Sequence, residues 1–378
     1  MVKQEAFELE QFIDKYETEV KYNVAETCCY SMSLREIENI SGNKFDFDKI
    51  ANERLAYSYI QGSPGLKKAI GGLYETIGPE NLVVTNGGIG ANFLSFYTLV
   101  GPGDHVIVLS PIYQQLSSVP KMFGADVEII KLKFEDGFQP NLKQLEAKMR
   151  KNTKMIVMNN PNNPTGCIFP QETVLKIVDI ARKYGSYILS DEVYRPLFHS
   201  LEPADSEPKA IADLYERGIS TGSMSKSFSV AGIRLGWIAS RDKNVIEGSL
   251  IRRDFNMISV GVIDDIIAQY VLQNKEAIMK HNYQLCVQNL VILDDAIRRS
   301  KGKLEYVRPK AGTTAFVKVN NKDVPSTMQM CLDLAKHDNV LAVPGETFNY
   351  PGFLRIGFAN RREDLINGLE KILAYLNV

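Results

Sequence analysis

Between residues 82 and 239, short apolar runs alternate with helix-length segments, and this alternation limits the possible fold more than any other feature of the sequence. Most of the runs are separated by segments long enough for a helix, such as 172–184, a spacing typical of parallel strands joined by crossover helices. We therefore predict an α/β fold whose large domain holds a mainly parallel seven-stranded sheet, sandwiched by helices on both faces. The seven predicted strands are 82–84, 105–109, 127–130, 155–158, 187–189, 219–221 and 235–239.

The pattern changes after a long helical stretch from about residue 280 to residue 300. Beyond it, strand-like segments mix with helices, which indicates a smaller α+β domain. The predicted large domain spans 45–280, and 1–44 with 281–378 form the small domain and its N-terminal arm. The predicted strands beyond 300 are 303–307, 313–319, 340–343 and 353–358, and the predicted helices are 327–336 and 363–376.

Charge and composition exclude several kinds of partner. The 44 Lys and Arg residues balance 45 Asp and Glu residues without long runs of one sign, which argues against nucleic acid or an anionic membrane. The five cysteines lack a C-x-x-C pair and the four histidines lie far apart, so no disulfide framework and no metal site is expected. The acidic N-terminus lacks an apolar signal core, and no apolar run is long enough to cross a bilayer. We expect a soluble, cytoplasmic protein that binds small molecules.

The segment from Thr221 to Trp237 places a single lysine, Lys226, among serines, with Arg234 eight residues further on. Apolar-leaning segments precede and follow the stretch that contains Lys226, so this lysine is expected on a loop where a strand ends. This is the position at which α/β enzymes hold reactive groups. A phosphate-binding P-loop is excluded, since that motif needs glycine immediately before the lysine and Ser225 stands there. We interpret Lys226 as the chemical centre of the protein.

Three further motifs directly follow predicted strands: Asn86-Gly-Gly-Ile-Gly, Asn160-Pro-Asn-Asn-Pro-Thr-Gly166 and Asp191-Glu-Val-Tyr194. The carboxyl ends of parallel strands meet at one edge of a sheet, so these motifs are expected close to the Lys226 loop. The glycine cluster precedes a predicted helix, Ala91 to Val100, whose N-terminus attracts phosphate. Asp191 ends an apolar strand, where a buried carboxylate needs a cation or a hydrogen-bond donor.

Together these motifs resemble the aminotransferase class I and II family, with the aspartate aminotransferase fold (fold type I). The resemblance covers most of the chain, from Tyr57 through Arg355, and keeps the family's order and spacing. It implies pyridoxal 5'-phosphate as cofactor, amino acids and 2-oxo acids as substrates, and a homodimer with shared active sites. The sequence at residues 223–227 and 252–255 is also similar to that of a subgroup that includes capreomycidine synthase.

Carried over to this sequence, the resemblance makes Lys226 the lysine that bonds covalently to the cofactor and later moves the substrate's proton. Both roles need an unprotonated amine, and we expect Arg234 and partial desolvation to depress its pKa from about 10.4. Asp191 resembles the carboxylate that keeps the pyridine nitrogen protonated. Asn163 and Tyr194 resemble the pair that binds the cofactor's phenolic oxygen.

The remaining assignments also follow from the resemblance. Tyr113 is similar to the aromatic residue stacked on the cofactor ring, and Tyr57 to the tyrosine that reaches the phosphate from the other subunit. Arg355 resembles the arginine that binds the substrate α-carboxylate, with Asn163 beside the substrate. The predicted phosphate-binding residues are Gly87, Gly88, Ile89, Ser223, Ser225 and Arg234.

The outcome of the reaction stays open between transamination and β-elimination, β-replacement or cyclisation on the same fold. We find no second arginine for a substrate's distal carboxylate, which argues against an aspartate specialist. Glu26 lies in the N-terminal arm near Tyr30. If its carboxylate faces the pocket, a substrate with a basic or hydrogen-bond-donating side chain is favoured.

Overall fold

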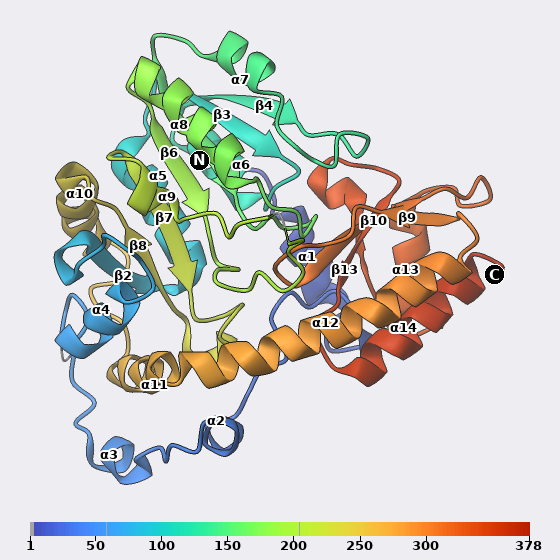
Figure 1. The fold of residues 1–378 in the computed structure, drawn as a ribbon, viewed down its shortest axis with the longest axis horizontal. Helices are drawn as coiled ribbons and strands as arrows, with labels where there is room; N and C mark the ends of the chain where they lie inside the picture. Colours follow the sequence, from blue (N-terminus) through green and yellow to red (C-terminus); the bar gives the residue numbers. More distant parts are fainter. Residues whose placement is uncertain (1–3, 58, 204) are drawn as a thin grey trace.

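The computed structural model describes residues 4–57, 59–203 and 205–378. The predicted seven-stranded sheet is confirmed (Figure 1). Six of the strands run in the same direction and β8 runs in the opposite direction. The strands lie in the order β2 (Leu82–Asn86), β8 (Leu235–Ala239), β7 (Gly218–Ser223), β6 (Tyr187–Asp191), β5 (Thr153–Asn159), β3 (His105–Ser110) and β4 (Asp126–Lys131).

Both faces of this sheet are buried, because alternate side chains of each strand enter different cores. In β3, Val106 and Val108 pack into one core, whereas Ile107 and Leu109 pack into another on the opposite face. The first core is covered by α5 (Gly87–Leu99), α6 (Gln115–Met122) and α10 (Lys243–Arg253). The opposite face is covered by α4 (Pro64–Gly71), α7 (Leu142–Lys148), α8 (Gln171–Tyr184), α9 (Ile211–Leu214) and α11 (Val262–Gln273).

Two predicted helix boundaries are wrong. The apolar spacing of residues 66–77 in the sequence predicts a helix that is closed by Gly78. The helix there, α4, ends already at Gly71, because Gly71 and Gly72 lower helix propensity where the chain turns. The helix expected to start at Ala91 is α5, whose first turn already contains the glycine cluster. The backbone N–H groups of that cluster therefore belong to the helix N-terminus itself.

The long helix predicted near residue 280 is α12 (Lys275–Arg299), which runs from α11 to α14 beside the second part of the molecule (Figure 1). That part contains a four-stranded antiparallel sheet and helices α13 (Thr327–His337) and α14 (Arg362–Tyr375). The sheet has the order β12 (Val343–Pro344), β13 (Phe353–Gly357), β10 (Thr314–Val319) and β9 (Leu304–Tyr306).

The N-terminal arm belongs to this second part through backbone pairing. Its strand β1 (Tyr22–Asn23) pairs in parallel with β11 (Val340–Leu341). Upstream of β1 the arm forms α1 (Glu8–Tyr16), and downstream it forms α2 (Leu34–Ser41) and α3 (Phe47–Asn52). The strand predicted at residues 340–343 is therefore split between two sheets, because β11 pairs with the arm and β12 pairs with β13.

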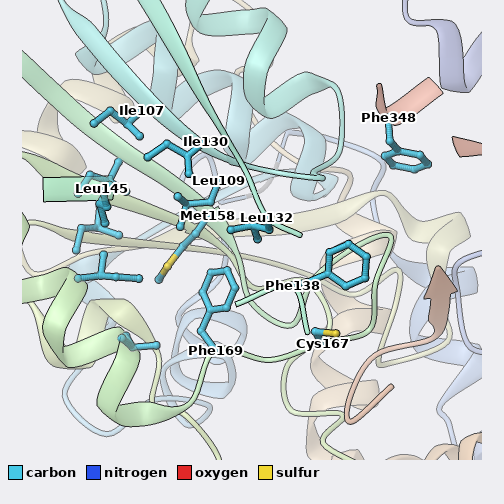
Figure 2. Close-up of a cluster of buried hydrophobic side chains, with 14 of the residues drawn as sticks. Ile107, Leu109, Ile130, Leu132, Phe138, Leu145, Met158, Cys167, Phe169 and Phe348 are labelled. Atoms are coloured by element: carbon cyan, nitrogen blue, oxygen red, sulfur yellow. The ribbon is translucent and has the colours of Figure 1, made fainter. Parts of the chain in front are cut away.

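One apolar core joins the two parts. Figure 2 shows Ile107, Leu109 and Met158 of the large sheet in the same cluster as Phe138 and Phe348. Phe316 of β10 links the two phenylalanines, with ring centroids 6.1 Å from Phe138 and 5.7 Å from Phe348. This continuous core fixes the second part against the carboxyl edge of the large sheet, where the predicted motifs lie.

Candidate active site

The carboxyl edge of the large sheet gathers the predicted motifs. β2, β3, β5, β6 and β7 run in one direction, so the residues that follow them meet at this edge. β8 runs the other way, which brings Arg234, immediately before it, to the same place. A cavity of about 400 Å³ opens there. Eleven predicted site residues line it: Gly88, Ile89, Tyr113, Asn163, Asp191, Tyr194, Ser223, Ser225, Lys226, Arg234 and Arg355.

Two predicted site residues do not line the cavity. Gly87 lies beside it, since a Cβ atom built there would be 2.9 Å from Nη2 of Arg234. Tyr57 is 67% exposed in this chain. The chain alone therefore does not bring Tyr57 to the other motifs.

Lys226 lies on the loop after β7, as predicted, and the N-terminal arm runs along this loop. Its Nζ donates a 2.6 Å hydrogen bond to Oγ1 of Thr27 and lies 3.5 Å from Sγ of Cys28. The backbone N–H of Cys29 donates to the Lys226 carbonyl oxygen. Sequence reasoning missed Thr27 and Cys28, because their position depends on how the arm packs, not on any local motif.

The expected depression of the Lys226 pKa is wrong for this chain. Burial lowers the pKa of the ammonium, whereas three nearby groups raise it, namely Cys28, Tyr194 and Glu26, and the net direction is above the ordinary value. Burial also raises the pKa of the Cys28 thiol to about 12 and raises the pKa of the Tyr194 phenol, so both are neutral at neutral pH. The Glu26 carboxylate therefore favours the protonated Lys226. The positive charge that lowers the Lys226 pKa is that of Arg355 and not, as we expected, that of Arg234.

Asp191 is buried at the end of β6, and Asn92 of α5 holds its side chain in place. Asn92 Nδ2 donates a 2.9 Å hydrogen bond to Oδ2 of Asp191, and the N–H of Val193 donates to Oδ1 at 3.2 Å. Thr221 Oγ1 in turn donates to Oδ1 of Asn92 at 2.7 Å. Burial raises the pKa of Asp191 and these donors oppose the rise, so a cation in the cavity would favour the carboxylate further. Asn92 was not predicted, although an asparagine inside the apolar α5 is a signal that could have found it.

Arg355 on β13 is buried, and only some of its N–H groups have hydrogen-bond partners among the described residues. Its Nη2 donates to the Ala25 carbonyl at 2.9 Å and its Nη1 to Oδ1 of Asn163 at 3.4 Å. Its Nε has no hydrogen-bond partner among the described residues. A buried donor without a partner is costly, so this guanidinium is prepared for an anionic ligand.

A second anion-binding group lies at the N-terminus of α5. A Cβ atom at Gly88 would come within 2.8 Å of Val193 and 3.3 Å of Ser223, so only glycine lets the helix N-terminus reach the cavity wall. The Ser225 hydroxyl accepts a 3.3 Å hydrogen bond from Nη1 of Arg234, whose backbone adopts a left-handed conformation with φ of 45°. Helix N–H groups, hydroxyls and a guanidinium together suit a phosphate.

The N-terminal arm adds carboxylates that sequence reasoning missed. Glu10 and Glu17 of the α1 segment line the cavity together with Glu26. The Tyr113 hydroxyl donates a 2.7 Å hydrogen bond to Oε1 of Glu10. Oε1 of Glu26 accepts from the backbone N–H groups of Thr27 and Cys28, so half of this carboxylate is already occupied.

The described residues hold no cluster of three or more histidine, cysteine or acidic side chains suited to a metal ion. Within the same residues, no helix combines the length and apolar character needed to cross a membrane.

Comparison with known proteins agrees with this arrangement. The family model described as aminotransferase class I and II matches residues 40–372. Aspartate aminotransferase of Thermotoga maritima is 32% identical over 319 residues, which cover 83% of this chain and 80% of that protein. Capreomycidine synthase of Streptomyces vinaceus is 31% identical over 299 residues, covering 78% and 74%. The structure of a PLP-dependent aminotransferase from Streptococcus suis has a TM-score of 0.94 and 39% identity, covering 99% of this chain and 98% of that one.

Proposed function

The chain belongs to the aminotransferase class I and II family, and we propose that the cavity beside Lys226 is its active site. The protein is a pyridoxal-phosphate-dependent aminotransferase, which moves an amino group from an amino acid to a 2-oxo acid. The proposal for the site rests on one observation: Lys226, Asp191 and Arg355 line the same cavity, and the Nε of Arg355 has no hydrogen-bond partner among the described residues.

The residues fit the cofactor. Gly87, Gly88 and Ile89 of the helix N-terminus, with Ser223, Ser225 and Arg234, form the phosphate end. Buried Asp191 supplies a carboxylate for a protonated ring nitrogen, and Tyr113, Asn163 and Tyr194 line the same cavity. When bound, pyridoxal phosphate withdraws electrons from the substrate's Cα, which makes the Cα–H bond acidic.

The chain's own residues supply the remaining steps. Arg355 binds the substrate α-carboxylate, with Asn163 fixing the guanidinium and contacting the substrate. Lys226 Nζ, once it has lost its own proton, accepts the proton from the substrate's Cα and holds it for the step in which it is returned. Thr27 Oγ1 orients this amine, because it accepts the Nζ hydrogen bond. The arm and β13 enclose the site, which limits access of water to these groups.

Mixing the purified protein with single amino acids is expected to convert the visible spectrum of the lysine-bound cofactor to that of pyridoxamine phosphate, with release of the matching 2-oxo acid. The measurement is absorbance together with quantification of the oxo acid. If no amino acid in a broad panel produces both changes, aminotransferase activity at this site is refuted.

Similarity to capreomycidine synthase favours a second candidate, β-elimination or cyclisation on the same cofactor. Release of pyruvate and ammonia in equal amounts from cysteine-type substrates, without pyridoxamine phosphate, would identify elimination. Transamination instead consumes one 2-oxo acid for each one formed.

We also propose that the chain forms a homodimer with shared active sites in the cytoplasm. Several large apolar side chains are exposed on segments 55–60 and 251–258, including Tyr57 at 67% and Phe255 at 79%. Such exposure is typical of an interaction surface. The proposed large domain spans residues 45–280, and the proposed small domain consists of residues 1–44 and 281–378. The pairing of β1 with β11 supports placing the N-terminal arm in the small domain.

Heterodimers of a Lys226→Ala chain and a Tyr57→Phe chain are expected to regain about half of the wild-type activity per dimer. If Tyr57 serves the partner's site, one site of each heterodimer carries both changes and the other carries neither. Activity is measured on heterodimers purified with two different tags, and the two variant homodimers are the controls. Activity no higher than half of the Tyr57→Phe homodimer value would place Tyr57 in the site of its own chain.

A further inference from the structure

The part of the cavity that remains for the substrate side chain is lined with negative charge. Three cations line the cavity, and the proposed function already uses each of them: Lys226, Arg234 and Arg355. Asp191 is assigned to the cofactor. The charged lining residues that remain among the described part of the chain are all acidic, namely Glu10, Glu17 and Glu26.

Two of these carboxylates come from one face of one helix. Glu10, Ile13 and Glu17 are spaced by three and four residues, which places them on the same side of α1, and all three line the cavity. Glu17 is the C-cap of α1, where the helix dipole adds partial negative charge. This face of α1 therefore presents two carboxylates separated by one apolar side chain.

α1 is fixed over the cavity through contacts with the residues after β3. The Tyr113 hydroxyl bonds to Glu10, and the Phe7 and Tyr113 rings lie 5.0 Å apart between centroids. Gln114 Nε2 donates a 2.7 Å hydrogen bond to the Ala6 carbonyl. The helix and its Glu10 carboxylate are thus held in place before any substrate arrives.

Glu17 lies close enough to the other two glutamates for their charges to act on it. Burial raises the pKa of Glu17, and the negative charges of Glu26, Asp14 and Glu10 raise it further. Oε1 of Glu26 is occupied by backbone N–H groups, and its charge also acts on Lys226. Oε1 of Glu10 accepts one hydrogen bond from Tyr113, whereas Oε1 of Glu26 accepts two from the backbone. A cation near Glu10 and Glu17 would relieve the repulsion on Glu17.

An independent observation shows that the cavity is built for a ligand. Arg355 is 2% exposed, lines the same cavity and keeps an Nε donor without a partner among the described residues. That donor suits a carboxylate, whereas the α1 wall suits the opposite charge. The cavity is therefore polarised for a molecule that carries an anionic group at one end and a cationic group at the other.

We propose that Glu10 and Glu17 select amino acid substrates whose side chains end in a cation, such as a guanidinium or a primary ammonium. This inference rests on the proposed function and names its substrate class. Glu26 takes a supporting role, because its Oε1 accepts two backbone N–H groups and its charge acts on Lys226. A substrate with a side-chain carboxylate finds no unassigned cation among the described cavity residues of this chain.

The test compares substrates that differ in charge but hardly in shape. Arginine is paired with citrulline, and lysine is paired with norleucine. The wild-type protein is expected to show a kcat/KM for arginine and lysine about tenfold or more above that of the neutral partner, as one partly shielded ion pair provides. The preference is expected to fall as salt is raised, since these carboxylates are partly exposed.

In the double variant Glu10→Gln and Glu17→Gln, the arginine to citrulline ratio and the lysine to norleucine ratio are each expected to fall to within about twofold. Glu8→Gln is the control: it removes one negative charge from the same helix, yet Glu8 does not line the cavity. It is expected to keep the wild-type ratio. Because the ratio is taken within one variant, a general loss of folded protein does not change it.

Three results overturn the proposal: a wild-type ratio near one, an unchanged ratio in the double variant, or an equal fall in Glu8→Gln. In each case, neutral amino acids that still react leave the aminotransferase assignment intact. If no amino acid of either charge reacts, the proposed active site fails as well.

Discussion

The Lys226→Ala protein is expected to lose covalent attachment of pyridoxal phosphate and to lose turnover by about 10⁴-fold or more, because one amine serves both as nucleophile and as proton carrier. Lys226 is the lysine that lines the cavity among the described residues, so no other ε-amine there can take its place. The expected spectrum is that of free cofactor. Single-turnover rates with an amino acid donor measure the lost proton transfer.

Borohydride reduction of the wild-type protein, followed by peptide mapping, provides the direct check. The label is expected on the peptide that contains Lys226, and Lys151→Ala, an exposed lysine far from the cavity lining, serves as control. Labelling of another lysine would contradict the assignment. So would near-normal turnover of Lys226→Ala.

Asp191→Ala is expected to retain bound cofactor and to lose activity by about 10² to 10³-fold, the size of effect seen when one buried electrostatic contact to the reacting system is removed. Without the carboxylate, the ring nitrogen loses the group that keeps it protonated and becomes a poorer electron acceptor. Asn92 Nδ2 also loses its acceptor, so part of the effect comes from disorder of this contact.

Asp191→Asn separates charge from shape, because the amide fills the same space. It is expected to lose nearly as much activity as the alanine variant while retaining cofactor, measured as kcat beside the ratio of cofactor to protein. Activity of Asp191→Asn close to that of the wild type would show that the negative charge is not needed. Loss of cofactor from both variants would instead make Asp191 a binding residue.

The local pattern of the sequence was sufficient to predict the large sheet. All seven predicted strands are present, because most of them are short apolar runs, buried on both faces, that are recognisable without knowing their neighbours. The same logic placed Lys226, Asp191 and Asn163 at strand ends, and the shared direction of the strands then required them to converge. Local signals were weaker at helix ends, where Gly71 and Gly87 moved the boundaries of α4 and α5.

The environment of these residues could not be read from the sequence. Thr27 meets Lys226 across 199 residues of chain, and Glu10 meets Tyr113 across 103. No periodicity encodes such contacts, since they arise from how the arm packs on β11 and over the cavity. The sign of the Lys226 pKa shift depends on the same packing, because it balances burial against the charges that the fold brings near. The reactive groups of the proposed site therefore lie in local motifs of the sequence, whereas their contacts and their pKa shifts depend on how the arm packs against the sheet.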